Sequence, residues 1–123
     1  MISNILATAT LFLGEVLPQD EQQVLEGFCT EAFNHWSRRL KDGVALEACQ
    51  FALVPACALT ALEGFLMGRE GAAAPISFTA GEVSLRQEGG NFMIRLQGLR
   101  AAAERLMAPY VPDEGFYFRG VRG

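Results

Sequence analysis

His35 is the only histidine of the chain, and histidine is the side chain best suited to proton transfer near neutral pH. It precedes Trp36, with Arg38 and Arg39 close behind. A catalytic histidine also needs an orienting partner and a nucleophile or substrate group within reach. The sequence indicates neither, so we interpret His35 as structural and keep a small enzyme using His35 and a nearby carboxylate as an alternative.

Glu63 is a second candidate, because a carboxylate inside an apolar helix can have a raised pKa. Thr60 lies three residues earlier and therefore on the same side of a helix. We interpret the two residues as a narrow solvated or inter-subunit edge of that helix.

The segment Glu88-Gly-Gly-Asn91 precedes an expected helix, where free backbone N–H groups can bind anions. It lacks the Lys and the Ser or Thr of a phosphate-binding loop. We therefore interpret its glycines as a flexible hinge.

Three cysteines, Cys29, Cys49 and Cys57, occur in apolar surroundings without a CxxC pair. On one helix, Cys49 and Cys57 would be separated by about 12 Å of rise, too far for a disulfide. His35 is the only other soft ligand, so zinc is not expected. The cysteines are predicted to be reduced core residues, and neither a metal nor a cofactor is predicted.

The chain of 123 residues carries 10 basic and 14 acidic residues, a net charge of −4. This balance disfavours specific nucleic-acid binding. Residues 1–85 hold ten acids against four basic residues, whereas residues 86–123 hold four acids against six. Separated signs can produce head-to-tail contacts between copies, although charges scattered over solvated faces remain an equally good interpretation.

Two helices are predicted before residue 42. The first spans about 2–16 and is closed by Pro18; the second spans about 20–41, capped by Asp20 with Gln23 in a box and ended by Gly43. Their expected buried positions are Ile2, Ile5, Leu6, Ala9, Phe12, Leu13, Val16, Val24, Leu25, Phe28, Cys29, Ala32, Trp36 and Leu40.

A third helix, about 45–67, is apolar on almost every face and must be enclosed by other helices. Pro55 predicts a kink, and Gly68 is expected as the left-handed residue after its end. Its longest unbroken apolar run, 51–59, is shorter than the roughly eighteen residues of a membrane span. No basic residue precedes Arg38, so no secretory signal or membrane association is expected.

Residues 76–86 alternate in polarity and predict a β-hairpin. A turn at Ala80-Gly81 would pair Ile76 with Leu85 and Phe78 with Val83, and it would place the apolar side chains on one face. A bulged turn that uses Gly81 is equally acceptable. A lone two-stranded ribbon is marginal in water. The apolar face is therefore expected to be covered, either by the chain's own helices or by an adjacent subunit.

A fourth helix, about 91–109, is predicted with Asn91 as its cap and Pro109 and Pro112 at its end. Its packing stripe is Phe92, Leu96, Leu99, Ala103, Leu106 and Tyr110. An extended tail, 110–123, follows. The predicted fold class is all-α: one domain over 1–123, a compact four-helix structure with a short β-hairpin between its third and fourth helices and an extended C-terminal tail.

Six segments follow one another along the chain: a short N-terminal helix, Trp36-Ser-Arg-Arg-Leu-Lys-Asp-Gly-Val44, an alanine-rich helix, Ser77-Phe-Thr-Ala-Gly-Glu-Val-Ser84, Arg105-Leu-Met-Ala-Pro-Tyr110 and Gly115-Phe-Tyr-Phe-Arg-Gly-Val121. In this order they resemble the small head-tail connector (head-completion or adaptor) proteins of long-tailed bacteriophages and prophages. The resemblance covers nearly the whole chain and rests on the order of elements.

The resemblance implies a non-enzymatic virion protein at the head-tail junction, assembled in the bacterial host cytoplasm. Its expected partners are further copies of itself in a homo-oligomeric ring, the portal protein and the tail-side connector proteins. DNA would pass through the assembly without specific binding. The expected interface residues are Ile76, Phe78, Val83, Leu85, Arg86, Phe116, Tyr117, Phe118 and Arg119. The alternative is a small intracellular protein-binding or regulatory module that dimerises through the stripe of the fourth helix.

Overall fold

The protein is all-α in character, with a short β-ribbon inserted before its last helix. The computed structural model describes the backbone of residues 1–69, 76–80, 83–87 and 92–112, and the side chains of residues 1–68 and 96–112. The elements follow in the order α1 (Ile2–Leu13), α2 (Gln19–Arg39), α3 (Leu46–Arg69), β1 (Ile76–Ala80), β2 (Val83–Gln87), α4 (Phe92–Met107) and the 3-10 turn η1 (Ala108–Tyr110).

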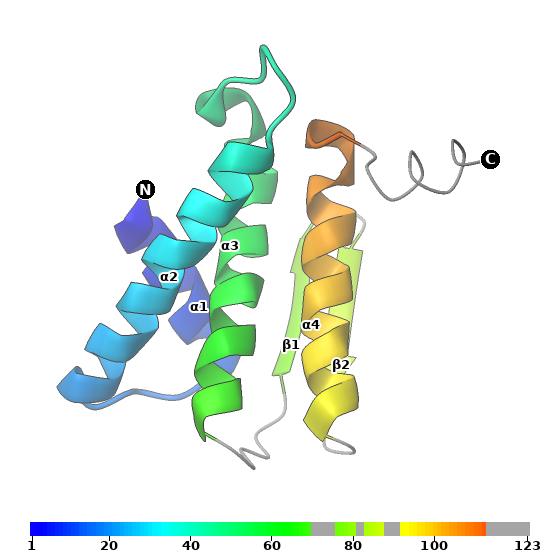
Figure 1. Ribbon diagram of the computed structural model, residues 1–123. Coiled ribbons are helices and arrows are strands. Elements are labelled where there is room, and N and C mark those ends of the chain that lie inside the picture. Colours follow the sequence, from blue (N-terminus) through cyan, green and yellow to red (C-terminus); the bar gives the residue numbers. More distant parts are fainter. Residues whose placement is uncertain (70–75, 81–82, 88–91, 113–123) are drawn as a thin grey trace.

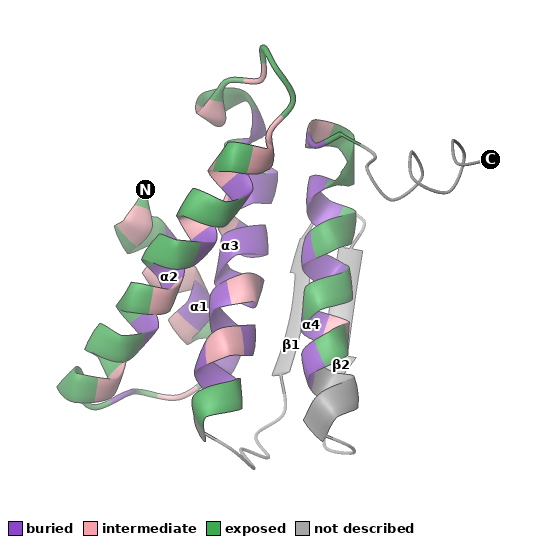
Figure 2. Cartoon of the chain, viewed as in Figure 1, coloured by how far each residue is buried: buried purple, intermediate pink, exposed green. Residues whose placement is uncertain are grey.

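Helix α3 is the central element of the fold. It packs against α1, α2 and α4, with α1 and α2 on one side and α4 on the other (Figure 1). Because α3 has neighbours on several sides, buried residues lie around most of its circumference. Helix α2, in contrast, has a broad exposed face (Figure 2). The prediction that the third helix is enclosed by other helices is confirmed.

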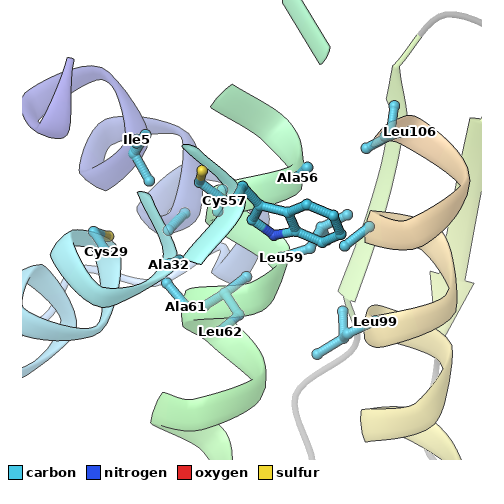
Figure 3. Packing of buried hydrophobic residues seen from close by; sticks show 14 of the residues in the cluster. Ile5, Cys29, Ala32, Ala56, Cys57, Leu59, Ala61, Leu62, Leu99 and Leu106 are labelled. Atoms are coloured by element: carbon cyan, nitrogen blue, oxygen red, sulfur yellow. The ribbon is translucent and has the colours of Figure 1, made fainter. Parts of the chain in front are cut away.

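Large apolar side chains from all four helices meet at the core. Leu53, Leu59 and Leu62 of α3 are fully buried, and Leu99 of α4 is too; Figure 3 shows several of these side chains where α4 faces α3. Each such side chain stabilises the fold by about 1.5 to 3 kcal/mol when it leaves water. The stripe of α4 formed by Leu96, Leu99 and Ala103 is therefore part of this core.

The helix ends differ from the predictions because glycine and proline act at other positions than expected. Helix α1 ends at Leu13, where Gly14 takes a left-handed conformation (φ 76°) and its N–H donates to the Thr10 carbonyl at 3.0 Å. Val16 therefore follows the helix and is 94 % exposed, so its predicted burial was wrong. Val24, which is 54 % exposed, was also misassigned to the core.

Helix α2 begins one residue before the predicted cap. Pro18 occupies the cap position and Asp20 lies in the first turn, where its carboxylate still interacts favourably with the helix dipole. The helix ends at Arg39, and Gly43 takes a positive φ (89°) in the loop beyond it. Helix α3 continues through Pro55 to Arg69, so Gly68 lies inside the helix and does not end it.

Strands β1 and β2 pair in antiparallel fashion, but their register is shifted by two residues from the prediction. Ile76 is opposite Gln87, Phe78 opposite Leu85 and Ala80 opposite Val83. The residues between the strands are then Gly81 and Glu82, a Gly-X pair that two-residue hairpin connections favour over Ala-Gly. A shift by an even number keeps the alternation of faces unchanged.

The ribbon lies against helices of its own chain. Strand β2 runs alongside α4, and β1 contacts α1 (Figure 1). The side chains of both strands are outside the described residues, so the covering of their apolar face stays a prediction. The predicted cap Asn91 and the hinge 88–91 are also outside the described residues.

Residues 108–111, which follow α4, are held against the loop between α2 and α3. After α4, the turn η1 places Tyr110 so that its carbonyl accepts a hydrogen bond from the Lys41 backbone N–H at 2.9 Å. Val111, the next residue, is buried. The described part of the chain therefore ends at Pro112, close to a point that is held by the fold.

Candidate functional site

Two surface regions stand out among the described residues. The first is a polar groove, the hollow lined by α2, α3 and α4, whose polar residues include His35, Arg39, Thr60, Glu63 and Arg100. Its floor is α3, and its walls are α2 and α4, which both pack on α3. The groove brings together His35 and Glu63, the two residues that the sequence offered for chemistry.

Trp36 forms the base of the polar groove. Its ring is buried, and its Nε1–H donates to the Thr60 hydroxyl at 2.9 Å, while that hydroxyl donates to the Ala56 carbonyl at 2.9 Å. The Arg39 guanidinium lies 4.5 Å from the centre of the Trp36 ring, within range of a cation–π interaction. The polar atoms at the base are thus used within the fold.

Two ion pairs cross the polar groove. Arg39 of α2 donates to both carboxylate oxygens of Glu104 on α4, at 3.0 and 3.3 Å. Arg100 of α4 donates to Glu63 of α3, which raises the pKa of Arg100. Glu63 is only 8 % exposed and is paired within the chain, so its interpretation as a solvated residue was wrong, and a contact of this edge with another subunit stays a prediction.

His35 lies at the exposed margin of the polar groove, edge-on to Trp36. Its Nε2 is 3.5 Å from Nη1 of Arg39. Partial burial and the positive charges of Arg39 and Arg38 lower the pKa of His35, against an opposing effect of Glu104. Among the described residues that line the groove, no Ser or Cys accompanies this neutral imidazole. The arrangement suits a structural bridge between helices.

The second region is an uncharged surface on α1 and α3. Helix α1 contains no charged residue, and its exposed positions include Asn4, Ala7 and Leu11. Beside it, Asn4, Ala7, Thr8, Gln50, Phe51, Val54 and Pro55 line a shallow hollow, which we call the α1/α3 groove.

Phe51 is the most unusual side chain of the α1/α3 groove. It is 74 % exposed, and its one ring contact among the described residues is an edge-to-face contact with Tyr110, with 6.2 Å between ring centres. Leu11 of α1 is 76 % exposed. Sequence reasoning missed this surface, although the absence of charge from residues 1–14 was a signal that could have located it.

The interface residues expected from sequence are described only in part. Ile76, Phe78, Val83, Leu85 and Arg86 lie in β1 and β2, and the structure places their backbones beside α4 and α1. The tail residues Phe116, Tyr117, Phe118 and Arg119 lie outside the described residues. Whether the two sets meet in one interface stays a prediction.

The three cysteines are buried and free. Burial raises the pKa of Cys29 to about 11 and that of Cys57 to about 12, and it also raises the pKa of Cys49. No group of three or more His, Cys, Asp or Glu residues suited to a metal ion occurs in the part of the chain that the structure describes. The thiols are inert core groups in this state.

Within the described residues, one segment, Leu46–Gly68, is long and apolar enough by composition to cross a membrane, and 61 % of its apolar 18-residue window is buried in the domain. This burial is what the central helix of a packed domain requires.

No family model, no curated protein and no solved structure matches the chain.

Proposed function

We propose that this protein is a structural subunit of a phage or prophage virion, a head-tail connector that forms a ring between the portal protein and the tail. The proposal rests on the resemblance in the order of elements. The observation that best supports an assembly role is the uncharged exterior of α1 with Leu11 and Phe51 exposed beside it. Exposed apolar surface of this kind is typical of protein–protein contact sites.

In this proposal the apolar residues of the ribbon and the aromatic tail, Ile76 to Arg86 and Phe116 to Arg119, make the contacts between subunits. The subunit carries a net charge of −4, which suits a ring through which DNA must slide. The polar groove has a structural task, since its ion pairs hold α4 against α2 and α3.

The alternative function is a module that dimerises through the stripe of α4. The burial of that stripe speaks against this alternative. Leu96, Leu99 and Ala103 are buried against the rest of the domain and are not available to a second copy. A dimer would have to use another surface. The connector proposal is therefore the one that we carry forward.

The test is assembly with a portal protein. The purified chain is mixed with the portal protein encoded beside it, and particle mass is followed by light scattering while negative-stain images are recorded. We expect ring-shaped particles that contain both proteins. A chain that associates neither with itself nor with the portal protein contradicts the proposal.

A matched pair of variants sharpens the test. Leu11→Glu places a charge on the uncharged exterior of α1, whereas Ala101→Glu places the same charge on an exposed position of α4. If α1 contributes to assembly, Leu11→Glu reduces the yield of particles and Ala101→Glu does not. Equal yields from both variants would remove α1 from the proposed interface.

A further inference from the structure

We propose that the α1/α3 groove binds the aromatic segment Phe116–Phe118 of the same chain. This inference concerns a contact within one unassembled molecule and does not depend on the connector proposal. In a ring, the same segment would leave its own groove to contact a neighbour. The proposed occupant is a segment with three successive aromatic side chains.

The chain already contacts the α1/α3 groove close to the last described residue, Pro112. The Tyr110 ring lies against Phe51, which lines the groove, with 6.2 Å between ring centres. The Tyr110 carbonyl is held by the Lys41 N–H at 2.9 Å, and Val111 is buried. The chain therefore starts its last segment next to the groove, from a point fixed by the fold.

The aromatic segment is close enough to Pro112 along the chain to reach the α1/α3 groove. Phe116 is four residues beyond Pro112, and an extended chain spans about 3.3 to 3.6 Å per residue, so its side chain can lie about 13 Å from Pro112. Gly115 directly precedes the aromatic residues and permits a change of chain direction. A tether this short gives an effective concentration in the millimolar range, which favours the chain's own segment over that of a second copy.

The residues that line the α1/α3 groove suit aromatic side chains. The groove offers the exposed ring of Phe51 and the half-buried side chain of Val54 above the buried Pro55, and it offers amide and hydroxyl groups at Asn4, Thr8 and Gln50. No charged residue lines it. Phenylalanine rings prefer such a surface and can extend the edge-to-face contact that Tyr110 begins, while the hydroxyl of Tyr117 can bond to the polar rim.

The experiment uses the full chain with a nitroxide spin label at position 121, introduced by Val121→Cys. The native thiols Cys29, Cys49 and Cys57 are buried and have raised pKa values, so the label reacts selectively at the new position. NMR signals of the Thr8 methyl and of the Asn4 and Gln50 side-chain amides are then recorded. We expect strong broadening of these signals and none at Asn34, on the exposed face of α2.

A mixed sample identifies the source of the segment. Isotope-labelled chain without a nitroxide is combined with unlabelled chain that carries it, so any broadening must come from a second copy. We expect none in the mixed sample. Broadening found only there would assign the groove to a neighbour's tail and overturn the proposal, as would the absence of broadening in both samples.

Two matched pairs of variants test the contact itself. Phe116→Ala with Phe118→Ala should abolish the broadening, whereas Arg119→Ala with Arg122→Ala, in the same tail, should preserve it. On the domain, Ala7→Glu should abolish it and Ala101→Glu should not, because both are exposed helix positions but only Ala7 lines the groove. Broadening that survives Ala7→Glu and the double phenylalanine variant would overturn the proposal.

Discussion

The polar groove and the α1/α3 groove differ in how far the chain satisfies its own side chains. In the polar groove, Arg39 is paired with Glu104 and Arg100 with Glu63, and the Trp36 N–H is bonded to Thr60. At the α1/α3 groove, Phe51 is mostly exposed. A region rich in ionisable residues thus serves the fold, while a region with none offers surface to another segment or molecule.

Residue type alone is therefore a poor guide to which surface of this protein is functional. His35 and Glu63 are candidates in the sequence because they can ionise. In the structure, however, His35 lies beside Arg39 and Glu63 is paired with Arg100, so both contact residues of the same domain. The exposed apolar residues Leu11 and Phe51 leave most of their surface in water, which is unfavourable until another segment or molecule covers it. The predictions below contrast the two regions.

The largest contrast is expected from removing one aromatic side chain in each region. Trp36→Ala should lower the free energy of unfolding by about 3 to 5 kcal/mol, because Trp36 is buried and its ring supports Arg39 and Thr60. Phe51→Ala should lower it by much less, because the Phe51 ring is 74 % exposed and loses only its contacts with Tyr110 and with the proposed tail segment. Urea unfolding of both variants measures this. A loss for Phe51→Ala as large as that for Trp36→Ala would contradict this ranking.

A smaller effect is expected where α2 crosses α3. A Cβ on Gly64 would lie 2.7 Å from Cδ1 of Phe28, so Gly64→Ala must displace that ring. We expect a net loss of about 1 kcal/mol after the gain in helix propensity is subtracted. Gly27→Ala is the control, since nothing lies within 4 Å of its added Cβ, and it should stabilise by about 0.5 to 1 kcal/mol. Thermal unfolding of both variants checks the sign.

The Arg39–Glu104 pair should contribute less still. Both side chains are partly exposed, and exposed pairs contribute about 0.2 to 1 kcal/mol. A double-mutant cycle with Arg39→Ala and Glu104→Ala should give a coupling energy in this range that decreases with added salt. A coupling of zero would show that the bridge between α2 and α4 does not hold them together.

The smallest expected effect is the pH dependence caused by His35. Its folded-state pKa lies below the ordinary value, so between those two pKa values the unfolded chain binds more protons. Stability should therefore decrease as the pH falls below about 6.5 and level off below the folded pKa. His35→Gln should flatten this part of the profile in urea titrations at pH 5 and pH 7. An unchanged profile would show that His35 is not held near Arg39 in solution.

Sequence patterns predicted the helices well because their main signal, the apolar stripe, is the property that drives packing. Ile5, Ala9, Leu25, Cys29 and Trp36 are all buried as expected. The helix ends were less well predicted. At the end of the first helix the sequence offers both Gly14 and Pro18, and only the packed fold selects Gly14 as the end of α1.

The pairings of the polar groove could not be predicted. Glu63 and Arg100 are 37 residues apart and Arg39 and Glu104 are 65 apart, so their contacts depend on how α4 packs on α3. No local spacing reports such a contact. The exposure of Phe51 was hidden for a related reason, since an apolar residue in an apolar helix is expected to be buried until the positions of α1 and α4 are known.

The hydrogen bond between the Lys41 N–H and the Tyr110 carbonyl has a mechanical consequence. Tension applied to the chain beyond Pro112 reaches the loop that joins α2 to α3 through this bond, before it can peel α4 from the core. The load is thereby shared between the last helix and the loop at the start of the central one. Pulled from beyond Pro112, the protein would therefore resist unravelling better than the packing of α4 alone would allow.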